Sequence, residues 1–139
     1  MQTTKMLLLV LSIISLSLFV YSAEARSFGG LGFDFESHID GKIYKSTGRF
    51  RNGLGKGIHR QFSDKKLVRK EKYKDGICHT TYYYENGKIM TEGNTKMVLT
   101  ENEIHWFYNG DWKFYDESGQ LIGTRTYENG AILNETEIK

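Results

Sequence analysis

The stretch Tyr84-Glu85-Asn86-Gly87-Lys88-Ile89 recurs as Tyr115-Asp116-Glu117-Ser118-Gly119-Gln120-Leu121 and again as Tyr127-Glu128-Asn129-Gly130-Ala131-Ile132. Each copy has an aromatic residue, then a polar turn with a glycine, then an aliphatic residue. Asn-Gly and Asp-Gly between apolar runs indicate hairpins, because a type I′ turn needs positive φ at both central residues. The recurring phrase therefore predicts a small β-hairpin unit that is repeated along the chain.

The spacing of the turns supports this prediction. The glycines expected in turns are Gly53, Gly76, Gly87, Gly110, Gly119 and Gly130. Two of the gaps between them are long, and Asp64-Lys65 and Glu101-Asn102 are expected to supply one unmarked turn in each. Proline is absent from the chain, and no helical period is sustained after residue 25. The expected fold is all-β: an elongated antiparallel meander of successive β-hairpins in a single sheet.

The N-terminus has a different pattern. A lysine precedes an apolar run from Met6 to Val20, and Ala23-Glu24-Ala25 follows. This layout is typical of a secretory signal peptide. The alternative is an uncleaved anchor, for which 15 residues fall short of the roughly 20 that span a bilayer. We expect a signal peptide over residues 1–25, cleavage near Ala25, and a secreted or periplasmic protein.

The remaining chain is expected to contain a lead-in segment, residues 26–47, followed by the hairpin repeats, residues 48–139. Aromatic residues are expected on both faces of the sheet, since Trp106 and Tyr108 alternate with His105 and Phe107. Their main role is expected to be cross-strand packing in a sheet that has no second layer. Stacking on bases or sugars is the alternative.

Charge is distributed unevenly along the sequence. Residues 42–74 contain twelve Lys or Arg and two acidic residues, a net charge of +10, whereas residues 75–139 contain five basic and eleven acidic residues, a net charge of −6. A positive field of this size attracts anionic lipid headgroups or polyanionic glycans; no nucleic acid partner is expected. The alternative is a solvated sheet edge, which lysines protect from aggregation. The candidate binding residues are Lys65, Lys66, Arg69, Lys70, Lys72 and Lys74.

No catalytic or metal-binding constellation is apparent. The single cysteine, Cys78, cannot form an internal disulfide; it is expected to be a small buried residue, with a reactive or intermolecular thiol as the alternative. Cys78 and His79 point to opposite faces of a strand and cannot act as a dyad. The histidines lack ligand spacing, so no metal, cofactor or enzymatic activity is expected. An enzyme whose site is spread over distant strands is the remaining alternative.

The phrases over residues 82–94 and 112–123 resemble MORN repeats, in particular the bacterial variant with Tyr-x-Asn-Gly-x-x-x-x-Glu-Gly and Gly-x-Trp-x-x-Tyr. The resemblance covers residues 48 to about 133 and is poor before residue 73. This chain inserts Met97 to Tyr108, where we expect one extra hairpin. The resemblance implies an elongated, curled sheet and no catalytic residues. Eukaryotic MORN arrays act as scaffolds, dimerise and have been linked to phospholipids, and some bacterial members are labelled antitoxins.

The leading functional hypothesis is therefore an exported, non-enzymatic repeat module that binds a protein partner or an anionic lipid or glycan. The alternative is an immunity or antitoxin-like protein that neutralises a toxin. Homo-oligomers could form through the open edges of the sheet.

Overall fold

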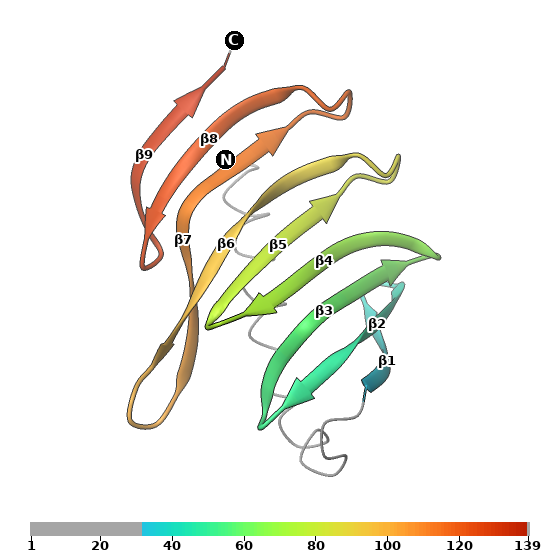
Figure 1. Cartoon of the computed structure of the whole chain (residues 1–139). Coiled ribbons are helices and arrows are strands. Elements are labelled where there is room, and N and C mark those ends of the chain that lie inside the picture. Colours follow the sequence, from blue (N-terminus) through green and yellow to red (C-terminus); the bar gives the residue numbers. More distant parts are fainter. Residues whose placement is uncertain (1–31, 139) are drawn as a thin grey trace.

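A computed structural model describes residues 32–138 of the chain. The expected signal peptide lies outside these residues. The described part forms one antiparallel sheet in which strand order follows sequence order from β1 to β9 (Figure 1). The strands are β1 (Gly32–Ile39), β2 (Lys42–Arg51), β3 (Leu54–Ser63), β4 (Lys66–Lys74), β5 (Ile77–Tyr83), β6 (Ile89–Leu99), β7 (Ile104–Tyr115), β8 (Leu121–Glu128) and β9 (Ala131–Glu137).

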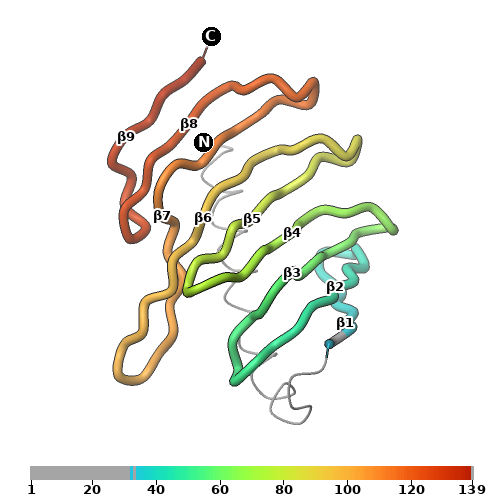
Figure 2. Tube along the Cα trace, viewed as in Figure 1, coloured from blue at the N-terminus to red at the C-terminus, as the bar shows by residue number. Residues whose placement is uncertain are grey.

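This arrangement confirms the predicted all-β meander of hairpins. Each strand pairs with the next one along the chain, and β1 and β9 form the two edges of the twisted, curled sheet (Figure 2). The expected lead-in segment includes β1 and most of β2, and these strands pair with each other and with β3. The described part of that segment therefore belongs to the same sheet as the repeats.

Five of the turns have the type I′ signature. Both central residues have positive φ at Asp40-Gly41, Asn52-Gly53, Asp64-Lys65, Asp75-Gly76 and Asn129-Gly130. Gly53, Gly76 and Gly130 are thus confirmed as turn glycines, and the unmarked turn at Asp64-Lys65 is confirmed as well. The turn at Asp40-Gly41 was not predicted, because it lies outside the repeated phrase.

Gly87 and Gly119 occupy a different kind of turn from the one predicted. In each loop only the glycine has positive φ, 83° and 91°. The Gly87 amide donates to the Tyr84 carbonyl at 2.9 Å, and the Tyr84 amide donates to the Lys88 carbonyl at 2.8 Å. These bonds define a three-residue loop with a bulge at the glycine. The glycine is still required, but the expected type I′ geometry is wrong here.

The prediction of a turn at Gly110 is also wrong. Gly110 lies inside β7, with φ of 72°, where the register of β7 shifts against Glu92 and Asn94 of β6. One type of β-bulge places a glycine at positive φ, as a type I′ turn does, so Gly110 has a structural role but forms no turn. The insertion from Met97 to Tyr108 consequently forms no extra hairpin. It lengthens β6 and β7, which extend beyond their neighbours to a tip at Thr100–Glu103 (Figure 1).

The core of the sheet lies on one face, which we call the inner face and define by Arg69, Cys78, Trp112 and Tyr127. Strand alternation places the buried side chains there, with Thr81 as the exception. The opposite, outer face also carries aromatic side chains, since His105 stacks on Phe107 at 5.8 Å between ring centroids. The prediction that both faces carry aromatic residues is confirmed.

Two groups of rings hold the inner face. On β7 and β8, Tyr108 contacts Trp112 and Tyr127 at centroid distances of 4.5 and 5.2 Å. Toward β2, a row of four rings runs across the strands at centroid spacings of 4.7 to 5.5 Å: Phe50, His59, Tyr73 and Trp106. Between these groups lies a polar cluster.

Candidate binding surfaces

Cations gather on the outer face of β2, β3 and β4. Arg60 lies directly opposite Lys70, and Lys72 lies opposite Ile58. We call this surface the lysine face and define it as Arg49, Lys56, Arg60, Lys70, Lys72 and Lys74. All six are exposed except Lys70, which is half-buried. Within the described residues none of the six forms an ion pair, so their charges face solvent.

The structure brings together only part of the predicted binding set. Lys70, Lys72 and Lys74 lie side by side on the outer face of β4. Lys65 occupies the β3–β4 turn at φ of 66°. Lys66 pairs with Ser63 beyond a register shift at Gln61/Phe62, which changes the phase of alternation and moves Lys66 to the inner face.

Arg69 is separated from the predicted set altogether. Its side chain lies on the inner face and is only 8% exposed. The remaining members of the lysine face, Arg49, Lys56 and Arg60, were missed by the sequence analysis. They come from β2 and β3, and only the strand register shows that they lie beside the β4 lysines.

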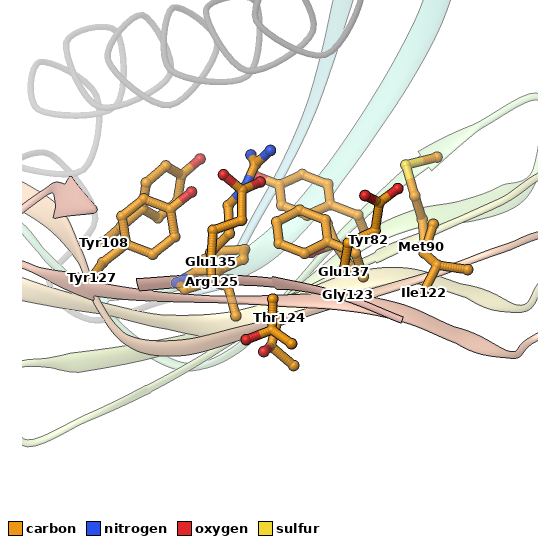
Figure 3. Close-up of a pocket in the computed structure, with 14 residues that line it drawn as sticks. Tyr82, Met90, Tyr108, Ile122, Gly123, Thr124, Arg125, Tyr127, Glu135 and Glu137 are labelled. Carbon is orange, nitrogen blue, oxygen red and sulfur yellow. The ribbon is translucent and has the colours of Figure 1, made fainter. Parts of the chain in front are cut away.

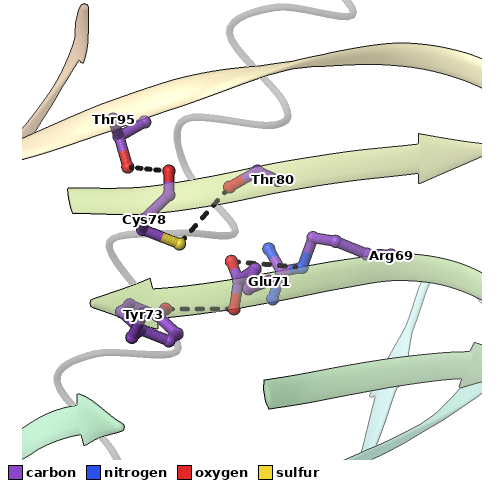
Figure 4. Close-up of polar contacts among 6 residues, drawn as sticks. All are labelled: Arg69, Glu71, Tyr73, Cys78, Thr80 and Thr95. Atoms are coloured by element: carbon purple, nitrogen blue, oxygen red, sulfur yellow. Dashed lines mark hydrogen bonds and ion pairs between the residues drawn. The ribbon is translucent and has the colours of Figure 1, made fainter. Parts of the chain in front are cut away.

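The buried polar cluster on β4 and β5 centres on Arg69 and Glu71 (Figure 4). Arg69 Nε lies 3.6 Å from Glu71 Oε1, and the Tyr73 hydroxyl donates to Glu71 Oε2 at 3.0 Å. Burial lowers the pKa of Arg69, but the Glu71 carboxylate, acting together with Tyr82 and Tyr73, outweighs burial and raises that pKa above its usual value. The guanidinium therefore stays charged and neutralises a carboxylate that would otherwise be buried alone.

Cys78 belongs to the same cluster and is only 2% exposed. Burial, followed by the Glu71 charge, raises the pKa of its thiol to about 12. Its sulfur lies 3.5 Å from the Thr80 hydroxyl (Figure 4). A thiol that is buried and protonated is a poor nucleophile. The structural interpretation of Cys78 as a small buried residue is confirmed.

A groove lies on the inner face over β5 to β9, with a volume of about 650 Å³. Its floor is aromatic and includes Tyr82, Tyr108, Trp112, Phe114 and Tyr127. Figure 3 shows the three tyrosines on the same side of the ribbon as Arg125, Glu135 and Glu137, which form the charged wall of the groove. The sequence analysis expected the aromatic residues to serve mainly in cross-strand packing. The groove was not predicted, because it depends on cross-strand neighbours that no spacing reveals.

The groove combines apolar surface with a few polar atoms. The Arg125 guanidinium lies 5.1 Å from the centroid of the Phe114 ring, and Arg125 Nε lies 2.7 Å from Glu135 Oε1. Burial raises the pKa values of the Tyr82 and Tyr108 hydroxyls, that of Tyr108 to about 12. Both phenols are therefore neutral at physiological pH. The Tyr82 hydroxyl is buried near Arg69, but it makes no hydrogen bond of regular geometry within the described residues.

Over residues 32–138, no group of three or more His, Cys, Asp or Glu side chains is placed to hold a metal ion. The same residues include no helix that is long and apolar enough to cross a membrane.

Comparison with known families matches two segments of the chain. The family model described as MORN repeat variant matches residues 79–97 and 108–129. The gap between the two segments is the tip of the β6–β7 hairpin, which the insertion lengthens. No curated protein and no solved structure matches the chain. The two matched segments and the meander of hairpins agree, and the chain contains repeats of the MORN variant type over these segments.

Proposed function

We propose that this protein is an exported, non-enzymatic interaction module whose lysine face binds anionic surfaces, with anionic phospholipid headgroups as its first ligand class. MORN repeats are generally protein- or membrane-interaction modules and a non-catalytic repeat type. The observation that carries the proposal is the pairing of Arg60 with Lys70 directly across β3 and β4. Like charges at opposite positions in a sheet are destabilising.

The alternative explanation of the lysines, protection of a sheet edge, does not fit their position. β2, β3 and β4 are interior strands, and the edges are β1 and β9. Their cations therefore do not block edge-to-edge pairing. The unpaired cations of the lysine face repel one another and destabilise interior strands. A ligand that neutralises these charges explains why they are gathered there.

The proposal is tested by flotation with vesicles rich in phosphatidylglycerol and with vesicles of pure phosphatidylcholine. The mature protein is expected to float only with the anionic vesicles, and less as salt exceeds about 0.1 M, where the Debye length is about 10 Å. Replacing Lys70, Lys72 and Lys74 with glutamate should weaken binding at least about a hundredfold, because each lysine near an anionic surface is worth about 1 kcal/mol.

A matched control replaces Lys66, Lys88 and Lys113 with glutamate. It changes net charge by the same amount and leaves the lysine face intact. This variant should keep most of the binding, with thermal melting used to verify that both variants fold. Equal losses in the two variants would show that net charge alone is sensed. A wild-type protein that ignores anionic vesicles would overturn the proposal, and tight one-to-one binding of a toxin would then favour the immunity or antitoxin-like alternative.

A further inference from the structure

The edge strand β9 has a backbone that is open to a partner. Every residue from Ala131 to Glu137 is exposed. The Ile138 amide donates to the Ile122 carbonyl at 2.9 Å. In an antiparallel pair the backbone groups of successive residues point alternately toward and away from the neighbouring strand. Thr136 therefore faces β8, and the N–H and C=O groups of Glu135 and Glu137 face away from the sheet.

The same two residues carry the charge on this edge. Glu135 lies opposite Arg125, and Glu137 lies opposite Gly123, so both carboxylates stand on the inner face beside the groove (Figure 3). Arg125 forms an ion pair with Glu135, whereas no ion pair is formed by Glu137 within the described residues. A strand added at this edge would bond to the backbone of both glutamates and place its own opposing side chains beside their carboxylates.

A second copy of this chain is a poor occupant of the edge. If the β9 strands of two copies paired, Glu135 and Glu137 of one copy would lie beside Glu135 and Glu137 of the other. The other edge, β1, carries exposed Asp34 and Glu36. Like charges directly opposite destabilise a strand pair, so Glu135 and Glu137 oppose the pairing of β9 with a second copy. The glutamates of β9 thus disfavour a homo-oligomer formed through this edge.

We propose that β9 binds an extended segment of a partner protein, by strand addition, and that this segment carries Lys or Arg at alternate positions. Main-chain hydrogen bonds to Glu135 and Glu137 supply affinity, and the alternating cations beside the two carboxylates supply specificity. This site lies at the opposite end of the sheet from the lysine face, and its occupation does not depend on lipid binding.

The test titrates the isotope-labelled mature protein with a short capped peptide in which lysine alternates with threonine and valine. The amides of Glu135 and Glu137 are expected to gain protection from hydrogen exchange, while Thr136, already bonded to β8, does not change. Binding should weaken as salt rises. A peptide with glutamate in place of lysine serves as the control and should not bind.

Two pairs of substitutions on β9 raise the net charge equally and separate the two faces. Glu135→Gln with Glu137→Gln removes the inner-face carboxylates and should weaken peptide binding about fivefold or more, as expected for two cross-strand charge pairs. Asn134→Lys with Thr136→Lys adds charge on the outer face and should change binding little. Glu137→Pro removes an outward N–H without removing a bond to β8, and it should abolish protection at this edge.

The proposal is overturned if no binding is detected, if the glutamate peptide binds equally well, or if the perturbed amides lie around Glu101 and Glu103 at the β6–β7 tip instead of along β9.

Discussion

The β3–β5 region and the β6–β8 region belong to one continuous sheet, but they bury different kinds of side chain. In β6–β8 the inner face holds Tyr108, Trp112 and Tyr127, packed against one another. In β3–β5 the corresponding positions hold the ion pair of Arg69 and Glu71, with Cys78 beside it. The family match covers the first region except the tip of the β6–β7 hairpin, and only the β5 part of the second region.

The difference shows what the repeat phrase provides. Its loops stack on one another: the Tyr84 hydroxyl donates to the Tyr115 carbonyl at 2.8 Å, and Asn86 Nδ2 donates to the Glu117 carbonyl at 2.9 Å. Upstream of residue 73 the phrase is degraded, yet the meander continues through type I′ turns. Turn residues and strand pairing thus suffice for the fold even where the repeat phrase is degraded. The lysine face, except Lys74, lies in this degraded part of the sequence.

The largest expected effect tests the buried ion pair. Arg69→Met should lower the free energy of unfolding by roughly 3–5 kcal/mol, because it leaves the Glu71 carboxylate buried and unpaired. Adding Glu71→Leu to the same chain should restore most of the loss, since replacing both partners removes the buried charge. Denaturant unfolding measures both. If the double variant is as unstable as the single one, the loss does not come from an unpaired Glu71 carboxylate. The ion pair itself would then stabilise the fold more than hydrophobic side chains at the same positions.

The next effect tests the aromatic region. A Cβ at Gly93 would lie 2.3 Å from Cδ2 of Trp112, whose indole Nε1 donates to the Asn94 carbonyl at 2.9 Å. Gly93→Ala should therefore cost about 2–3 kcal/mol of stability through overpacking. Gly32→Ala, where the nearest atom is the Gly48 carbonyl oxygen at 3.4 Å, is the control and should have little effect. Similar melting temperatures for the two variants would contradict the packing of Trp112 over Gly93.

The sequence was sufficient for the class of fold and for most turns, because Asn-Gly and Asp-Gly encode backbone conformations locally. It was insufficient at Gly110, since a glycine at positive φ is found both in a β-bulge and in a hairpin turn. The sequence was also insufficient for the predicted binding set, because the register shift at Gln61/Phe62 places Lys66 on the face opposite to Lys70 and Lys72.

Arg69 was misplaced for a related reason. Burial of an arginine depends on a carboxylate two residues along the same strand and on neighbours across the sheet. The groove and the full lysine face likewise depend on the register of several strands, which no single segment encodes. These features are properties of the assembled sheet.

A third effect sharpens the comparison at the turns. Gly87→Val should cost about 1–2 kcal/mol through its positive φ alone, because no atom lies within 4 Å of the added Cβ. Gly130→Val should cost more, since its Cβ would also lie 3.2 Å from the Phe107 ring. Glu128→Ala is the control and should cost a few tenths of a kcal/mol at most. Equal melting temperatures for the valine and alanine variants would mean that these glycines are not conformationally required.

The smallest expected effect concerns pH. Burial lowers the pKa of His59 below its ordinary value of 6.5, despite its hydrogen bond to the Arg49 carbonyl and the nearby Glu71 charge; Arg69 lowers it further. The unfolded chain then binds the proton more readily, so stability is complete above pH 6.5 and falls as pH drops below that value. In the His59→Phe variant the free energy of unfolding should fall less between neutral and mildly acidic pH, as measured by denaturant unfolding. If the free energy of unfolding depends on pH as steeply as in the wild type, other groups cause the loss.

Binding at the lysine face is tested most directly by hydrogen–deuterium exchange of the mature protein with and without phosphatidylglycerol vesicles. Slower exchange is expected in peptides from β3 and β4, residues 54–74, and unchanged exchange in β7 and β8, residues 104–128. Protection in β7 and β8 alone, or none anywhere, would contradict the assignment of anionic-surface binding to the lysine face.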